Sequence, residues 1–341
     1  MATIKQIADL TNVSRGTIDR VINNRGRVSP ETEEKVRAAI EALNYLPNKA
    51  GKNLAVRKKN LRFGFILISP NNYNPFFLDV EKGIKKKAKE LETFGVSVDI
   101  RYTSPTDAST QIESMDYFAN NGYNGIAITA INSHGIAEKI REVSSRGIPV
   151  VTSNTDIPAS GRLAYTGSNY YQCGKVAANL LGLITNGCAK VGVITGSENV
   201  MCITERSLGF RDYLQKHYPN ISYVGAATNN RYDEIENYLI TKALLDEHPE
   251  IDALYLAAAG VSGACRAVTD SRRRITVVAN DCVSATKELM RQEVIAVTID
   301  QNPTYQGAKP LEILFDAATV GTAFIEEYYY TDAIIKVRTN I

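Results

Sequence analysis

Two arginines and an aspartate share the short stretch VSRGTIDRVIN, residues 13–23. If this stretch is helical, Ile18, Val21 and Ile22 make one apolar face, because residues three and four apart lie on the same side. The other positions are Arg15, Gly16, Asp19, Arg20 and Asn23. Guanidinium groups bind phosphates and guanine edges, whereas a carboxylate accepts a hydrogen bond from the cytosine amino group. The combination favours a helix that reads bases, since an acid would only weaken purely electrostatic binding to a polyanion.

A second set of candidate residues follows short β-rich runs in the rest of the chain. The set comprises Asn74, Phe76, Phe77, Asn154, Asp156, Arg206, Asp281 and Gln301. In parallel sheets, ligands bind beyond the carboxyl ends of the strands. Carboxylates, amides and a guanidinium group bind vicinal hydroxyls, and aromatic rings pack on the C–H face of a sugar. Each residue alone is also compatible with a helix cap or a turn, but their recurrence predicts a site for a polyhydroxylated ring.

Patterns for cofactor, metal and covalent chemistry are absent from the sequence. No GxGxxG follows a β-rich run, and there is no P-loop. The five cysteines are scattered without a CxxC pair, and the three histidines have no partner pattern. We therefore expect no cofactor, no metal site and no enzymatic activity.

Three short helices are expected in the first 47 residues. Thr3 and Gln6 have capping-box spacing for the first helix, and Asn12 tolerates the left-handed conformation of a tight turn. Ser14 offers an N-cap for the second helix. Ser29-Pro30-Glu31 combines an N-cap, a proline at the first helical position and an acid in the first turn. This arrangement predicts a helix-turn-helix unit whose second helix enters a major groove.

Positive charge is concentrated in this part of the chain. The whole protein carries a formal net charge of +2. Residues 1–62 hold 13 Lys and Arg against 6 Asp and Glu, a net charge of +7, and the remainder carries −5. A basic head on a mildly acidic body favours binding to nucleic acid by the head.

From residue 61 onward, β-rich runs alternate with helical patterns. The expected strands are LRFGFILIS, VSVDIRYT, GIAITAI, PVVTSN, KVGVITG, SYVGAAT, ALYLAAA, TVVAND and VIAVTID. Helices are expected at about 76–93, 107–121 and 134–146, and again between the later strands. Alternation at this spacing predicts an α/β body of two doubly wound parallel sheets beside the small all-α head. The expected boundaries are 1–47 for the head, 48–61 for a hinge, about 62–160 and 302–325 for lobe 1, and about 161–300 and 326–341 for lobe 2.

The basic joint LPNKAGKNLAVRKKNLR has two interpretations. It is a flexible linker, or it is a segment that becomes helical only on DNA. The second interpretation makes Leu54 an apolar wedge in a minor groove.

The first 54 residues resemble the head and hinge of the lactose/galactose repressor family. The resemblance rests on the order of VS-x-x-T-[VI]-x-RV-[LI]-N, V-S-x-E-T, Y-x-PN and the hinge leucine. It implies base contacts from Arg15, Gly16 and Arg20, phosphate contacts from Ser14, Thr17 and Asn23, and a wedge at Leu54. Thr3 and Asn48 are counted with these expected DNA contacts, and the resemblance implies a homodimer on a palindromic operator.

Two positions depart from that family's pattern. Asp19 stands where the family usually has serine, and Gly51 stands where the hinge usually has alanine. Glycine costs a helix interior roughly 0.5–1 kcal/mol, so it weakens the hinge helix. Asp19 either accepts a hydrogen bond from cytosine or pairs with Arg15 and holds its guanidinium for guanine.

Residues 61–341 resemble the type I periplasmic-binding-protein core, in particular its ribose-binding branch. NPFF, the arginine of ERSLGF, the aspartate of VVAND and the glutamine of TIDQNP carry the resemblance. It implies ligand contacts from Asn74, Phe76, Phe77, Arg206, Asp281 and Gln301. Two departures make ribose itself doubtful: SNTD replaces an Asp-Arg pair at Asn154, and ALYLAAAG lacks a polar residue near Ala257 or Ala258.

Together these features predict a ligand-responsive, sequence-specific transcriptional regulator whose effector is a sugar or polyol. Most proteins of this kind repress their target genes, so we expect a repressor. Two alternatives are a solute-binding protein without regulatory DNA binding and a regulator that responds to a purine or another non-sugar ligand. Because MATIKQIADL lacks the apolar core of a signal peptide and no long apolar run is present, we expect a cytoplasmic protein without a membrane partner.

Overall fold

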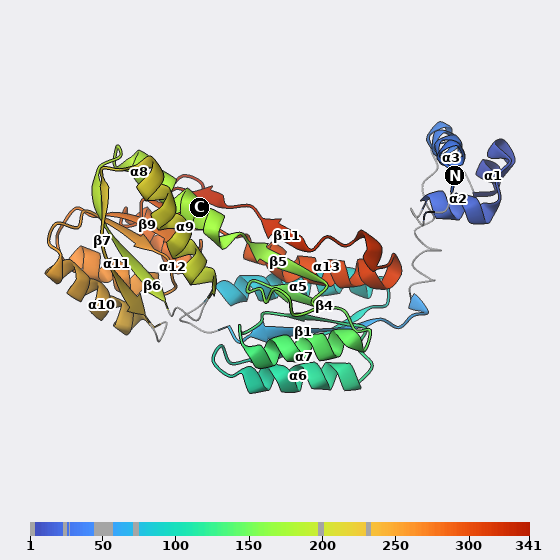
Figure 1. Cartoon of the computed structure of the whole chain (residues 1–341), viewed down its shortest axis with the longest axis horizontal. Helices are drawn as coiled ribbons and strands as arrows, with labels where there is room; N and C mark the ends of the chain where they lie inside the picture. The colour runs from blue at the N-terminus through green and yellow to red at the C-terminus, as the bar shows by residue number, and fades with distance from the viewer. Residues whose placement is uncertain are drawn as a thin grey trace.

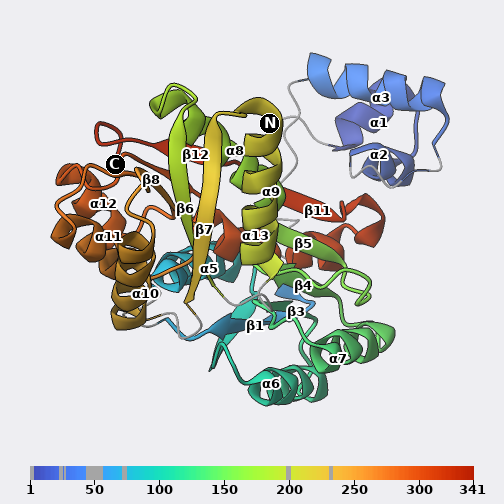
Figure 2. The same cartoon turned by 60° about the vertical axis from the view of Figure 1, so that its left-hand side comes forward.

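The computed structural model describes residues 4–22, 26, 28–43, 57–70, 75–196, 201–229 and 233–341. They form a small helical head and two α/β lobes (Figure 1), and the head also lies apart from the lobes in the turned view of Figure 2. The expected fold class is confirmed: an all-α head precedes two sheets that are covered by helices on both faces.

The head consists of α1 (Ile4–Thr11), α2 (Arg15–Ile22) and α3 (Pro30–Ala42). The tight turn between α1 and α2 contains Asn12 at φ 54°, as its tolerance of the left-handed region predicts. Ser29 caps α3, since its Oγ accepts from the Thr32 amide at 3.3 Å. The apolar side chains of the three helices meet in one core, which holds Ile7, Ile18, Val21, Val36 and Ala39.

Lobe 1 is a six-stranded parallel sheet. Its strands in spatial order are β11 (Tyr328–Thr331), β5 (Ala164–Ser168), β4 (Val150–Ser153), β3 (Gly125–Ile128), β1 (Arg62–Ile68) and β2 (Ser97–Thr103). Phe63, Phe65 and Leu67 of β1 pack with α5 (Phe76–Glu92) and α13 (Pro303–Thr319). Ile66 faces the other side, which α6 (Ala108–Asn120) and α7 (His134–Ser145) cover. After Arg62 the run FGFILI is apolar because both faces of this strand are buried.

Lobe 2 repeats this architecture. Its strands in spatial order are β12 (Ile334–Lys336), β10 (Val297–Asp300), β9 (Thr276–Asn280), β8 (Ala253–Leu256), β6 (Ala189–Gly196) and β7 (Ile221–Asn229). Only the short β12 runs antiparallel, against β10. One face packs against α8 (Tyr170–Ile184) and α9 (Met201–His217). The other face packs against α10 (Glu234–Glu247), α11 (Val261–Asp270) and α12 (Ser284–Arg291).

The lobe boundaries differ from those expected from the sequence. The strand β5, placed in lobe 2 by the boundary at residue 160, pairs with β4 in lobe 1. Likewise β11, placed in lobe 2 by the boundary at 326, pairs with β5, so only β12 of the C-terminal segment joins the second sheet. The chain therefore crosses between the lobes three times, after β5, after β10 and after β11.

Glycines let helices approach closely at the edge where the lobes meet. A methyl group on Gly83 of α5 would overlap the carbonyl oxygen of Thr304 in α13, and one on Gly307 of α13 would overlap that of Val80 in α5. A methyl group on Gly174 of α8 would overlap the carbonyl oxygen of Arg206 in α9. These contacts hold α5 against α13 and α8 against α9, and they place the backbone of Arg206.

Candidate functional site

The second helix of the head presents the surface that the sequence predicts. Ile18 and Val21 are buried in the core, whereas Arg15, Gly16 and Arg20 are exposed. Ser14 caps the helix: its Oγ accepts from the Thr17 amide at 3.2 Å and lies 2.9 Å from the Thr17 hydroxyl. Arg15, Gly16 and Arg20 thus lie on the side of α2 turned away from the core.

Gly16 is not required by packing of the head. A methyl group there would meet nothing closer than the Ser14 Oγ at 3.9 Å, and the position is exposed. A residue without a side chain at this place leaves the helix backbone open to close approach by a partner. Five other expected DNA contacts fall outside the described atoms: Thr3, Asn23, Asn48, Leu54 and the side chain of Asp19.

A cavity of about 100 Å³ lies between the two lobes. Lobe 1 contributes Pro75 and Phe76, and lobe 2 contributes residues at the ends of β8 and β9, including Asn280 and Asp281. On the β8 side the wall is formed by Ala259, Gly260 and Val261, in line with the apolar sequence there. Asn74, which directly precedes this wall, lies outside the described residues.

Asp281 and Gln301 form one hydrogen-bonded pair at the ends of adjacent parallel strands. Gln301 follows β10 and donates its side-chain amide to the Asp281 carboxylate. The Oε1 atom of Gln301 and the Oδ1 atom of Asn280 are buried and have no hydrogen-bond partner among the described residues. Such acceptors are costly unless a ligand or water donates to them, so they mark a place for hydroxyl donors.

Arg206 of α9 lies near Asp281. Its side chain is buried, its Nη1 donates to the Ala257 carbonyl at 3.2 Å, and its Nε has no partner in the described part of the chain. Burial acts against the charge, but the Asp281 carboxylate and other nearby groups raise the pKa of Arg206 above its usual value. Burial raises the pKa of Asp281 above its usual value, although Arg206 and the Gln301 amide act in the opposite direction. Arg206 and Asp281 thus lie in one buried site, where each acts on the pKa of the other.

A polar chain joins Arg206 to lobe 1. Its guanidinium lies 4.8 Å from the ring centroid of Tyr170, whose hydroxyl donates to the Asn154 carbonyl at 2.6 Å. Asn154 adopts the left-handed conformation at φ 63° and donates its side-chain amide to Gln306 at 3.1 Å. Of the expected ligand residues, Phe76 and Asp281 line the cavity. Gln301, Arg206 and Asn154 do not line it, but the contacts described above connect them to Asp281 or to one another.

Two expected ligand contacts are placed differently. Phe77 packs in the lobe 1 core, with its ring 5.4 Å from that of Phe76 at an interplanar angle of 87°, and it does not line the cavity. Asp156 is buried, and its carboxylate accepts from Arg162 Nη2 at 2.7 Å, Thr152 Oγ1 at 2.8 Å and the Ile157 amide at 2.8 Å. These contacts favour a structural role for Asp156.

Glu234 and Thr286 are polar cavity residues that were not singled out from the sequence. Asn280 stood in the expected strand end VAND, where either of two polar residues fitted the pattern. Glu234 and Thr286 lie in the first turns of α10 and α12, and a first-turn polar residue alone does not distinguish a ligand contact from a cap. Among the described residues, no group of three or more His, Cys, Asp or Glu is placed to hold a metal ion. No helix in the described ranges is long and apolar enough to cross a bilayer.

Comparisons with known proteins agree with this architecture. A family model described as periplasmic binding protein domain matches residues 64–323, and one described as bacterial regulatory proteins, lacI family, matches residues 3–48. The ribose operon repressor of Halalkalibacterium halodurans is 25% identical over 278 residues, which cover 81% of this chain and 77% of that protein. The transcriptional regulator MalR of Staphylococcus xylosus is 45% identical over 92 residues, 26% of this chain and 27% of that one.

A solved structure shares the two-lobed fold. The solute-binding protein of an ABC transporter from Burkholderia graminis, in complex with D-arabinose, has a TM-score of 0.75 at 24% identity and covers 82% of this chain and 96% of its own. The chain thus belongs to the periplasmic binding protein domain family and carries at its N-terminus the DNA-binding region of the lacI family of bacterial regulatory proteins.

Proposed function

We propose that this protein is a repressor of sugar or polyol utilisation genes whose affinity for its operator changes when a sugar-like effector binds between the lobes. The observation that carries the proposal is the site shared by Phe76 of lobe 1 and Asp281 of lobe 2, in a chain that begins with a helix-turn-helix head. A relative that is similar along most of this chain is named ribose operon repressor, a name that joins a sugar with repression.

The polar groups of the cleft suit a polyhydroxylated ring. Asp281 offers a charged acceptor, and the free oxygens of Asn280 and Gln301 offer neutral ones. Arg206 supplies a buried donor, because its Nε has no partner among the described residues. Phe76 supplies an apolar face beside them. A sugar satisfies all of these groups at once, whereas a purely apolar ligand would leave them unpaired.

Binding of the effector couples to the head through lobe closure. A ligand held by both lobes stabilises the closed arrangement, and the three crossings let the lobes move against each other. In a homodimer on a palindromic operator, closure changes the spacing of the two heads. The coupling is reciprocal, so operator DNA changes effector affinity by the same factor that the effector changes operator affinity.

A DNA titration and a thermal-shift screen test this function. Purified full-length protein is titrated onto labelled DNA from its own promoter region at several salt concentrations, and log Kd should rise steeply with log salt because phosphate contacts release counterions. A thermal-shift screen with pentoses, hexoses, inositols and purines should raise Tm selectively for one sugar or polyol. Absence of salt-dependent DNA binding would remove the repressor function and leave a solute-binding protein. A shift with purines alone would replace the sugar with a purine effector.

A further inference from the structure

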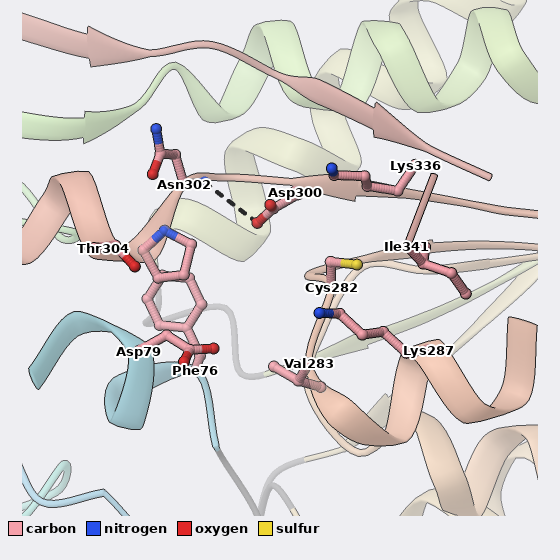
Figure 3. A pocket seen from close by; sticks show the side chains of 11 residues that line it. Phe76, Asp79, Cys282, Val283, Lys287, Asp300, Asn302, Thr304, Lys336 and Ile341 are labelled. Carbon is pink, nitrogen blue, oxygen red and sulfur yellow. Dashed lines mark hydrogen bonds between the residues drawn. The ribbon is translucent and has the colours of Figure 1, made fainter. Parts of the chain in front are cut away.

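A second and larger cavity adjoins the first on the other side of Phe76. It measures about 260 Å³ and is lined by side chains of both lobes, which Figure 3 shows from close by. The polar members of its wall are Asp79, Cys282, Lys287, Asp300, Asn302, Thr304 and Lys336. Phe76 and Val283 line both cavities, so the two spaces are neighbours.

At two strand ends, consecutive residues of the chain belong to the two neighbouring sites. After β9, Asp281 lines the smaller cavity and Cys282 the larger one. After β10, Gln301 binds Asp281 while Asp300 and Asn302 on either side line the larger cavity. A ring held by Asp281 and Gln301 therefore has room for a substituent that extends past Phe76.

Two lysines direct their ammonium groups into this larger cavity (Figure 3). Lys287 comes from α12 and Lys336 from β12. Within the described ranges, neither lysine forms an ion pair, and Lys336 donates to the neutral carbonyl of Asn340 at 3.3 Å. Both lie close enough to Cys282 to lower its pKa, although burial and the Asp300 carboxylate outweigh them and raise it. Both lysines therefore contribute positive charge to the part of the cavity next to Cys282.

The two carboxylates on the wall do not balance these charges. Asp79 forms an ion pair with Lys82 at 2.6 Å on its own helix. Asp300 accepts from the Asn302 amide at 3.3 Å, as the dashed line in Figure 3 shows. When Lys82 is counted with the wall, the charged side chains at this cavity are three lysines and two aspartates, a formal charge of +1.

Helix N-termini add to the positive potential. The first turn of α5 reaches the wall with Phe76 and Asp79, and its N-cap, Pro75, has no side-chain cap. The N-cap of α12, Val283, lies in the wall and also has no side-chain cap. The first turn of α13 contributes Pro303 and Thr304, and its N-cap Asn302 accepts from the Tyr305 amide at 3.3 Å. Backbone amides and dipoles at helix N-termini favour anions, so three helices and two lysines act in the same direction.

We propose that the larger cavity binds an oxyanion the size of a phosphate, in line with the sugar site, so that the preferred effector is a phosphorylated sugar. This rests on the proposed sugar-responsive function. Lys287 and Lys336 donate charge-assisted hydrogen bonds to the oxyanion, and backbone amides of the helix N-termini donate further ones. The same oxyanion can also come from free inorganic phosphate beside a neutral sugar, and the experiment separates the two sources.

The test uses full-length protein and calorimetric titration with matched pairs of neutral and phosphorylated pentoses and hexoses, together with inorganic phosphate alone. For the pair that binds, the phosphorylated sugar should bind at least about ten-fold more tightly than its neutral parent. In Lys287→Gln, Lys336→Gln and their double variant, this ratio should fall toward one. Lys287→Arg should restore part of it, because the charge returns. Lys242→Gln, an exposed lysine paired with Asp246 on α10, is the matched control.

The outcomes are distinct. Tighter binding of the neutral parent in presence of phosphate, lost in the double variant, supports the oxyanion site with free phosphate as its source. An equal ratio in wild type and double variant overturns the oxyanion site, and so does a phosphate-induced Tm shift that the double variant retains. The proposed repressor function fails by other results, namely the absence of salt-dependent DNA binding or of any sugar response, and these do not depend on Lys287 or Lys336.

Discussion

The side-chain amide of Gln301 donates to the carboxylate of Asp281, and the two residues end neighbouring parallel strands of lobe 2. This contact fixes both side chains before a ligand arrives. It also leaves the Oε1 atom of Gln301 unpaired within the described residues. Orientation of a charged acceptor by a second polar group is a form of preorganisation, which lowers the entropic cost of binding.

Asp281→Asn should weaken effector binding about 10- to 100-fold. The substitution removes a charged acceptor, and a hydrogen bond to a charged group contributes about 1.5–3 kcal/mol. Calorimetric titration with the sugar that gives the largest thermal shift measures the change. Operator affinity without sugar should match wild type, and Asp246→Asn, an exposed aspartate paired with Lys242, is the control. Unchanged sugar affinity would show that the ring binds elsewhere.

Asp156→Ala should lower the free energy of unfolding by about 3–5 kcal/mol, because it leaves Arg162 buried without its carboxylate. Glu327, 3.4 Å from Arg162 and largely exposed, compensates only in part. Urea denaturation measures this loss, and Asp246→Ala in the exposed pair with Lys242 should cost no more than about 1 kcal/mol. Sugar affinity should stay within about two-fold of wild type, a change of about 0.4 kcal/mol, because Asp156 does not line the cavity. A selective loss of sugar binding would restore Asp156 as a ligand contact.

The sequence predicted those elements whose signals are local. Strand segments such as FGFILI are apolar because both of their faces are buried. Ser14 and Ser29 indicate where helices begin, because their own hydroxyls cap the first turn. The strand β5 was missed because AYTGS is short and contains small and polar residues. Its neighbour β11 lies about 160 residues later in the chain, so no local pattern links the two strands. The lobe boundaries depend on that distant pairing.

For the site as well, the residues with a local sequence signal were predicted and those that depend on distant contacts were not. Arg206, Asp281 and Gln301 were identified because they follow strongly patterned strands. Tyr170, which bridges Arg206 and Asn154, was not, because its position depends on the close contact between Gly174 and the backbone of Arg206. A glycine in a helix does not reveal which partner it faces. Likewise, Lys287 and Lys336 become a pair only when α12 and β12 meet.

Tyr255→Phe should make the protein less sensitive to alkaline pH. Burial raises the pKa of Tyr255 to about 12, against an ordinary value of 10. Because the folded pKa is the higher one, the stabilising contribution of the neutral phenol is complete below pH 10 and is lost as pH rises from 10 to about 12. Removing the hydroxyl should therefore reduce the slope of stability against pH in this window by about 1.4 kcal/mol per pH unit.

Urea denaturation of Tyr255→Phe at several pH values between 9 and about 12 measures this slope. At neutral pH the variant should lose only about 0.5–1.5 kcal/mol, because Asn280 keeps its second acceptor, the Leu256 carbonyl, and the ring keeps its stack on Phe210. Tyr117→Phe, at a position 43% exposed, is the control. Equal slopes for wild type and Tyr255→Phe would mean that the phenol of Tyr255 does not resist ionisation.

Asp19→Ser should relax or shift base preference at one operator position without a uniform gain in affinity. Position 19 lies on α2, whose exposed residues Arg15, Gly16 and Arg20 face away from the head core. An acid on such a helix either accepts a hydrogen bond from cytosine or orients an arginine for guanine, and both roles select a base. Selection of bound sequences from a randomised operator library measures the preference, and Asp9→Ser on α1 removes the same charge from an exposed site outside α2. If both variants tighten binding to every sequence alike, Asp19 acts only by repelling phosphate, because an electrostatic effect carries no base information.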